Sequence, residues 1–249
     1  MTSTISAIPG VKRRMDPARK TALAAGIFYL LTFVSSIPAV FLIAPVLNDP
    51  NYITGAGADS QVIFGCMLDI VNAATAIGSA VALFSLLRRH SAGLALGFVT
   101  SRLMEGVIVM IGVVALLAVV TLRQAGAADG SDGTLVTIGH ALVVMRNWTF
   151  LLGPSLVPGI NALLLGTIMY RSRLVPRIIP LLGLIGAPLI IVSVITTVFG
   201  VNSGLSMFSN IATAPIFVWE LSLGLWMTFK GFRSTPLTDE FNASSKISR

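Results

Sequence analysis

Six long runs of apolar residues follow one another along the chain, and short polar stretches separate them. The runs are Ala22–Val46, Gln61–Leu87, Ala92–Leu122, Leu135–Tyr170, Ile178–Val201 and Ile211–Phe229. A helix needs about 20 mostly apolar residues to cross roughly 30 Å of hydrocarbon, and every run reaches about that length. The pattern therefore predicts an all-α, polytopic transmembrane helix bundle with six spans.

The fourth run, Leu135–Tyr170, is too long for one perpendicular span. Its 36 residues would reach about 54 Å as a helix. It also contains Pro154 and Pro158, and a proline removes a backbone donor and bends a helix. We expect Trp148–Tyr170 to cross the membrane. Leu135–Asn147 either packs against the bundle as a continuation of this span or lies at the membrane interface.

The spans take up most of the chain and leave no room for a soluble domain. We expect a basic N-terminal tail over residues 1–20, a six-helix transmembrane domain over 21–231 and a C-terminal tail over 232–249. The C-terminal tail is rich in Ser, Thr and Asn. Because such a composition buries little apolar surface, we expect this tail to be disordered.

The composition agrees with a membrane protein, since 55% of the residues are hydrophobic, 11% are charged and the mean hydropathy is +0.88. The net charge of +7 would also suit a nucleic-acid-binding protein. However, fourteen of the Lys and Arg residues fall on one predicted side of the membrane, and Arg123 alone falls on the other. This asymmetry predicts a cell-membrane protein with both termini in the cytoplasm. The expected partner is the lipid bilayer, and nucleic-acid binding is not expected.

The chain has few residues that could hold a metal or form a disulfide. Cys66 is the single cysteine, and His90 and His140 are the two histidines. These numbers exclude an intramolecular disulfide, a cysteine-cluster metal site and a histidine zinc cage. The sequence also contains no phosphate-binding loop and no His-Glu-x-x-His motif. We therefore predict no cofactor and no metal.

Five formally charged residues fall inside the predicted spans: Asp69, Arg102, Glu105, Arg146 and Glu220. A charged residue at the centre of a spanning helix costs about 2.5–3.5 kcal/mol on insertion scales. Each of these side chains is therefore expected to face the bundle interior, a partner or water.

Depth along the spans predicts which of these charges meet. Arg102 and Glu105 are three residues apart and share a helix face. Arg102 and Glu220 both lie near the middle of their spans, so we expect them to pair. Asp69 is expected at a depth similar to Glu105. The predicted buried polar cluster, a candidate binding site for a small molecule or ion, consists of Asp69, Asn72, Arg102, Glu105 and Glu220.

Three further residues are secondary candidates. Arg146 precedes Trp148, and we interpret the two as an anchor at the outer membrane interface. His140 is expected at the same interface. Asn161 shares a helix face with Asn147 and both prolines of the fourth span.

Four stretches together resemble a bacterial membrane family, the domain of unknown function 4386. They are GIFYLLTF at residues 26–33, RLMEG at 102–106, YRSRLVPR at 170–177 and WELSLGLWMTFKG at 219–231. The set covers most of residues 20–232. The resemblance implies a six-span membrane protein with Arg102, Glu105 and Glu220 at the polar positions of the family, and it implies no particular activity.

Two functions remain open from the sequence. The protein is either a binding or transport-type module with the polar cluster in a cavity, or a structural or regulatory subunit whose charges only fix helix packing. An intramembrane enzyme is the least supported class, because Gly153-Pro154-Ser155 lacks the glycine that a membrane serine protease has after its serine. The ligand and any protein partner are not identified by the sequence.

Overall fold

A computed structural model describes residues 15–55, 57–126, 132–204 and 206–247, and its regular elements are all helical. In chain order they are α1 (Pro17–Asn48), α2 (Asp59–Leu87), α3 (Ala92–Gly126), α4 (Asp132–Phe150), the π-helical segment η1 (Leu151–Leu156), α5 (Val157–Ser172), α6 (Ile178–Val198), α7 (Met207–Phe229) and α8 (Pro236–Ile247). Six helical stretches are long and apolar enough to cross a membrane, with α4, η1 and α5 together forming one of them. The predicted all-α, six-span bundle is confirmed.

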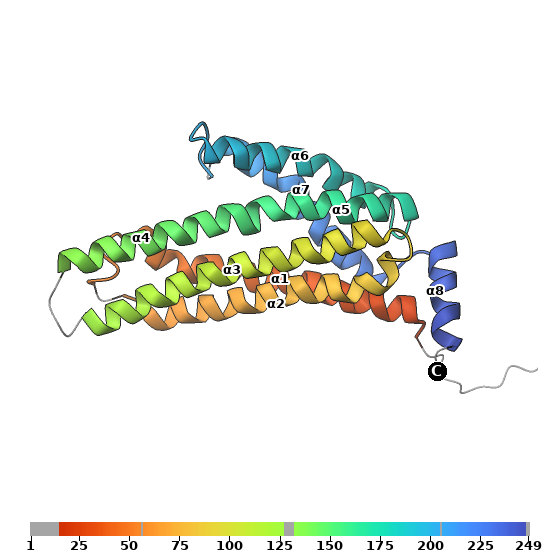
Figure 1. The fold of residues 1–249 in the computed structure, drawn as a ribbon, viewed down its shortest axis with the longest axis horizontal. Coiled ribbons are helices and arrows are strands. Elements are labelled where there is room, and N and C mark those ends of the chain that lie inside the picture. The colour runs from red at the N-terminus through yellow and green to blue at the C-terminus, as the bar shows by residue number, and fades with distance from the viewer. Residues whose placement is uncertain (1–14, 56, 127–131, 205, 248–249) are drawn as a thin grey trace, which may run out of the picture.

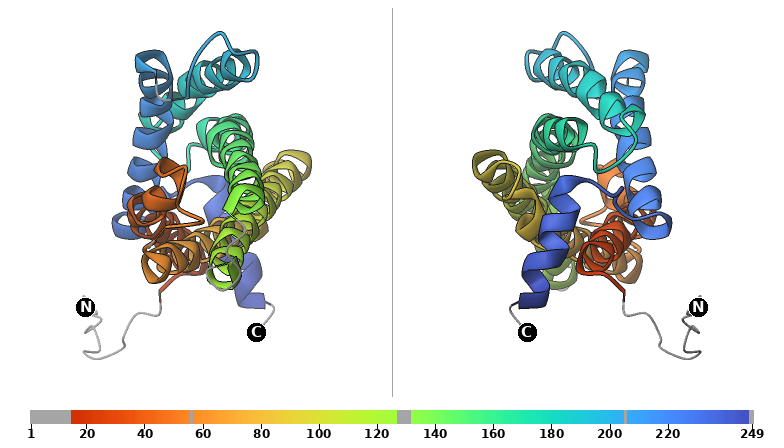
Figure 2. Two further views of the ribbon diagram at one scale, coloured as in Figure 1. Left: turned by 90° about the vertical axis from the view of Figure 1, so that its left-hand side faces the viewer. Right: turned by 90° about the vertical axis from the view of Figure 1, so that its right-hand side faces the viewer.

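The six spans pack in a closed cycle (Figures 1 and 2). Each span contacts the next one along the chain, and α7 packs back against α1. At one end Arg19 of α1 donates hydrogen bonds to the carbonyl oxygens of Met227 and Thr228, at 2.9 and 2.6 Å. A cation near these last carbonyls satisfies groups that the end of a helix leaves without partners. The first and last spans are thereby joined.

The two ends of the bundle differ in charge. We call the basic end the one at which α1, α3 and α6 begin, and the acidic end the opposite one. The connections at the basic end carry Arg88, Arg89 and the arginines around Leu174, whereas the acidic end carries Asp49 and Asp59. At the acidic end Arg123 pairs with Asp59, and the Tyr52 hydroxyl donates to the same carboxylate at 2.9 Å. Burial, with the neighbouring Asp59, raises the pKa of Tyr52.

The fourth span is one continuous helical stretch, Gly133–Ser172. Its N-terminal part does not break away from the bundle: α4 packs along α3 and extends beyond α6 and α7 at the acidic end (Figure 1). Pro154 lies inside η1, where the wider π-helical turn accommodates the missing backbone donor. Leu135–Asn147 therefore continues the helix of the fourth span and packs against the bundle.

The expectation of a disordered C-terminal tail is wrong for residues 236–247, which form α8 across the basic end (Figure 1). Pro236 lies at the first turn, where proline is tolerated. Leu237 and Phe241 are four residues apart and pack on the apolar core, while Ala18 N donates to Asn242 Oδ1 at 3.0 Å. The many polar residues of this segment led to the expectation of disorder, although Leu237 and Phe241 form a narrow apolar face on the helix.

The predicted N-terminal tail, residues 1–20, is described only from residue 15. Its last residues are helical, because α1 begins at Pro17.

The polar residues of the spans interrupt the apolar core. One core cluster fills the basic half around Tyr29, Phe98 and Trp219, and another fills the acidic half around Ile43 and Val113. On α3, Arg102 and Glu105 fall between Phe98 of the first cluster and the residues of the second. The fold therefore holds Arg102 and Glu105 between two apolar layers.

Candidate functional site

Arg102 is the centre of a buried polar group near the middle of the bundle. Its Nη1 lies 3.1 Å from Oε2 of Glu105 on the same helix, and its Nη2 lies 2.6 Å from Oε1 of Glu220 on α7. Asn161 of α5 donates from Nδ2 to the same Glu105 oxygen at 2.8 Å. We call these four residues, Arg102, Glu105, Asn161 and Glu220, the Arg102 cluster. The Arg102–Glu220 pair expected from matched depths is present.

Aromatic rings support the guanidinium of Arg102, which is only 3% exposed. Its Cζ lies 5.0 Å from the ring centroid of Tyr29 and 5.8 Å from that of Phe98. A cation over an aromatic face is stabilised by the ring quadrupole, more so when it is shielded from water. Residues of α1, α3, α5 and α7 thus meet at one buried charge.

Two atoms of the Arg102 cluster are buried without a hydrogen-bond partner: Arg102 Nε and Asn161 Oδ1. The cluster also contains two carboxyl groups and one guanidinium. A buried polar atom without a partner and a net charge in a low-dielectric interior are both unfavourable. Both features are unusual for a group that only holds helices together.

A second ion pair joins α2 and α4, with Arg146 Nη2 at 3.3 Å from Asp69 Oδ2. Arg146 is 6% exposed and its guanidinium lies 5.1 Å from the ring centroid of Phe150. The interpretation of Arg146 as an interface anchor is therefore wrong, although the neighbouring Trp148 is 45% exposed. Arg146 fits beside α3 because Gly112 leaves space: a Cβ there would lie 2.8 Å from Arg146 Cδ.

The single cluster expected from the sequence is two separate groups. No hydrogen bond or ion pair among the described residues joins the Asp69–Arg146 pair to the Arg102 cluster. Asp69 lies 18 residues from the basic end of α2 and Glu105 lies 13 residues from that of α3. At 1.5 Å per residue their depths are about 27 and 20 Å, more than one helical turn apart. Because α2 has 29 residues and α3 has 35, depths counted from opposite ends of the two helices do not correspond.

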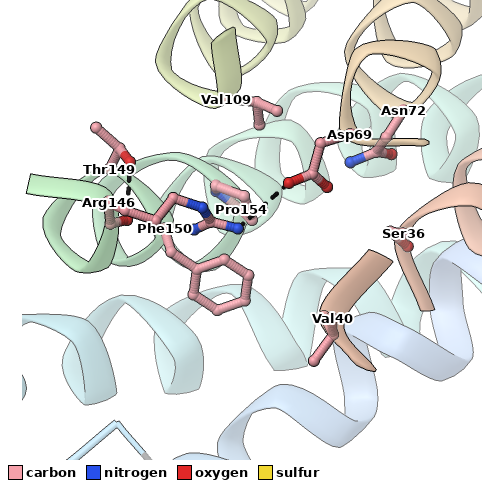
Figure 3. Close-up of a pocket in the computed structure, with 9 residues that line it drawn as sticks. All are labelled: Ser36, Val40, Asp69, Asn72, Val109, Arg146, Thr149, Phe150 and Pro154. Atoms are coloured by element: carbon pink, nitrogen blue, oxygen red, sulfur yellow. Dashed lines mark hydrogen bonds and ion pairs between the residues drawn. The ribbon is translucent and has the colours of Figure 1, made fainter. Parts of the chain in front are cut away.

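A small cavity of about 40 Å³ lies beside the Asp69–Arg146 pair. Figure 3 shows the two side chains pointing toward each other across it, with Asn72 next to Asp69. The lining residues are Ser36, Val40, Asp69, Asn72, Val109, Arg146, Thr149, Phe150 and Pro154. The volume and the polar lining suit bound water.

A much larger cavity, of about 780 Å³, lies between the C-terminal part of α4, η1 and the acidic-end halves of α1, α6 and α7. We call it the large cavity. Its walls combine apolar side chains such as Ile43, Leu151 and Ile190 with hydroxyl and amide groups. The polar lining residues are Asn48, Asn147, Ser155, Ser193, Thr197, Ser203, Ser209 and Thr213. Arg146 lines both cavities, and of the described residues around the large one it alone is charged.

The family model of the domain of unknown function DUF4386 matches residues 24–231. The chain belongs to the DUF4386 family. The resemblance found in the motifs is thereby confirmed, whereas no curated protein and no solved structure matches the chain.

The other predicted site residues of this DUF4386 chain lie as follows. His140 is exposed on α4, and its side chain makes no hydrogen bond to the described residues. Cys66 is buried in the apolar core. Asn161, a secondary candidate, belongs to the Arg102 cluster, and Asn72 is half-buried at the small cavity. Among the described residues, no group of three or more His, Cys, Asp or Glu could hold a metal ion.

Sequence reasoning missed two parts of the DUF4386 site. Tyr29 lies inside the stretch at residues 26–33, yet nothing in the spacing indicates that Arg102 would lie over its ring. The hydroxyl groups of α6 and α7 were also missed, because serine and threonine are common in spanning helices. Their concentration at the acidic ends of both helices is the sequence signal that indicates them. In the structure the hydroxyls of Ser193 and Ser209 lie 2.9 Å apart.

Proposed function

We propose that this DUF4386 protein is a binding or transport-type membrane protein that takes a small molecule or ion into the large cavity. The volume of about 780 Å³ falls within the range of roughly 300–1,000 Å³ typical of ligand sites. Mostly apolar walls with a few polar groups are also typical of such sites. The observation that carries the proposal is Arg146, a buried arginine among the residues that line this cavity.

The chemistry of the lining favours a ligand with an acidic group. Among the described residues, Asp69 is the only hydrogen-bond acceptor for the Arg146 guanidinium, which uses Nη2 for this contact. A guanidinium has five N–H donors arranged in a planar fork that matches a carboxylate or a phosphate. The remaining donors of Arg146 can therefore bind the acidic group of a ligand while the apolar walls hold its body.

Cysteine accessibility tests whether water enters the large cavity. In a Cys66→Ala background, Asn147→Cys places a thiol in the cavity lining, and Met145→Cys places one on the apolar outer face of the same helix. A membrane-impermeant maleimide should label the first variant and not the second, because the thiolate forms and reacts in water. Equal lack of labelling in both variants would contradict a water-filled cavity.

Ligand binding is tested by thermal shift of the purified protein with pools of small carboxylates, small phosphates and uncharged analogues. An acidic ligand should raise the melting temperature of the wild type and not that of Arg146→Gln. The matched control is Asp69→Asn with Arg146→Gln, which removes both charges and so leaves no buried charge unpaired. Stabilisation of the wild type by the uncharged analogues alone would contradict the role of Arg146.

The structural or regulatory subunit remains the alternative, and one observation favours it. The two ion pairs connect α3 with α7 and α2 with α4, so they also fix helix positions. If fixing positions is their sole role, Arg102→Leu combined with Glu105→Gln and Glu220→Leu, which leaves no buried charge unpaired, should fold almost as well as the wild type, although Arg102→Leu alone destabilises it. Such tolerance, together with no ligand in the thermal-shift experiment, would favour this alternative.

A further inference from the structure

The Arg102 cluster has one carboxyl group more than it has cations. The groups that face it from the surrounding helices are Tyr29 of α1, Arg102 and Glu105 of α3, Asn161 of α5 and Glu220 of α7. The α6 sequence has no ionisable residue, and Asp69 of α2 is paired with Arg146. If both glutamates were ionised, the cluster would carry one negative charge in the middle of the bundle. Burial of an uncompensated charge is strongly unfavourable.

Asn161 supplies an independent indication of which carboxyl group carries the proton that would balance the charge of the cluster. Asn161 is fully buried, and its Nδ2 donates to Glu105 Oε2 at 2.8 Å. Its Oδ1, on the same amide group, has no donor. The other oxygen of Glu105, Oε1, accepts no hydrogen bond from the described residues. An amide and a protonated carboxyl group are complementary, because each offers one donor and one acceptor side by side.

We propose that Glu105 is a proton-binding site. A proton taken from water adds to Oε1 of the Glu105 carboxylate, and the resulting O–H donates to Asn161 Oδ1. The protonated carboxyl and the amide then form two parallel hydrogen bonds. Arg102 and Glu220 remain as a balanced ion pair, and the cluster is neutral. Asn161 acts as a positioning residue, and the inference does not depend on the large cavity binding a solute.

Infrared spectroscopy of the wild-type protein in lipid nanodiscs tests the site without any substitution. At neutral pH the spectrum should contain the C=O stretching band of a protonated carboxyl group, and the band should shift in D₂O. Uniform ¹³C-glutamate labelling should shift it as well. The chain has three glutamates, and Glu240 is on α8 with its side chain 69% exposed, so the label reports on Glu105 and Glu220. The proposal is overturned if the spectrum has no such band, or if the band does not shift with the glutamate label.

Two variants and a matched control assign the band to its residue. Glu105→Gln should remove the band completely. Asp69→Asn, the same change of a buried acid in the other ion pair, should leave it in place. Asn161→Ala should move it to higher frequency, because the O–H loses its acceptor. Persistence of the band in Glu105→Gln overturns the site, and an unshifted band in Asn161→Ala overturns the role of Asn161.

Discussion

Gly183 shows how closely two spans approach at a single residue. The indole of Trp219 on α7 is fully buried and lies directly over this glycine of α6. A Cβ at position 183 would lie 2.6 Å from Trp219 Cδ2, a distance that requires the ring or the helix to move. Glycine at this position is therefore a condition for the packing of α6 against α7.

We predict that Gly183→Ala lowers the stability of the protein by about 1–3 kcal/mol, the usual cost of overpacking a well-packed core. The measurement is the midpoint of thermal unfolding in detergent. Gly93→Ala is the matched control, because a Cβ there meets no atom within 4 Å. Since alanine is the better helix former, the control should equal or slightly exceed the wild type. Equal losses in the two variants would contradict this account of Gly183.

We predict that Asp69→Leu destabilises the protein by about 1.5–3 kcal/mol, because it leaves the buried Arg146 guanidinium without its acceptor. Asp69→Leu combined with Arg146→Leu should recover most of this loss, since no buried charge is then unpaired. Thermal unfolding of the single and double variants measures the difference. A double variant less stable than the single one would show that the pair is not the source of the effect.

The positions of the site residues could be predicted from the sequence only where they depend on the geometry of a single helix. Arg102 and Glu105 share a face by their spacing, and the depth of Glu220 could be counted along one span. Arg146 could not be placed, because its depth depends on how far α4 extends along α3. The two cavities could not be predicted at all, since their walls come from helices whose contacts no periodicity specifies.

At the level of elements, all six spans follow from hydropathy alone, but their ends do not. The first span begins at Pro17 rather than at Ala22, and the third continues to Gly126. Hydropathy marks the part of a helix that lipid requires, whereas hydrogen bonding continues the helix into the aqueous layer until a cap or a turn ends it. Helix α8 was missed by hydropathy, because the two apolar residues that pack on the core, Leu237 and Phe241, are too few to register in a hydropathy pattern.

We predict that Phe241→Ser detaches α8 from the basic end without unfolding the spans. Phe241 packs on the core, and the guanidinium of Arg89 lies 5.2 Å from its ring centroid. Hydrogen–deuterium exchange should therefore increase in residues 236–247 and stay unchanged in α1 and α2. Ala243→Ser, an exposed position on the same helix, serves as control and should leave the exchange as in the wild type.

For the whole molecule, the difference in charge between its two ends predicts its orientation. Positively charged connections are retained in the cytoplasm, so the basic end with α8 should face inward. A fluorescent protein that matures only in the cytoplasm should fluoresce when fused after residue 249. Alkaline phosphatase inserted in the connection between α3 and α4 should be active, because it would then lie outside. The opposite pattern would reverse the orientation and place the large cavity on the cytoplasmic side.

The contact between α1 and α7 fixes the order in which the molecule can be completed. Synthesis begins at the N-terminus, so α3 with Arg102 is made before α7 exists. During that interval Glu105 is the carboxyl group within reach of the guanidinium. Glu220 arrives with the last span and closes both the helix cycle and the ion pair. A chain that stops before residue 207 would leave an open seam between α1 and α6, with the Arg102 guanidinium behind it lacking one of its two carboxyl partners.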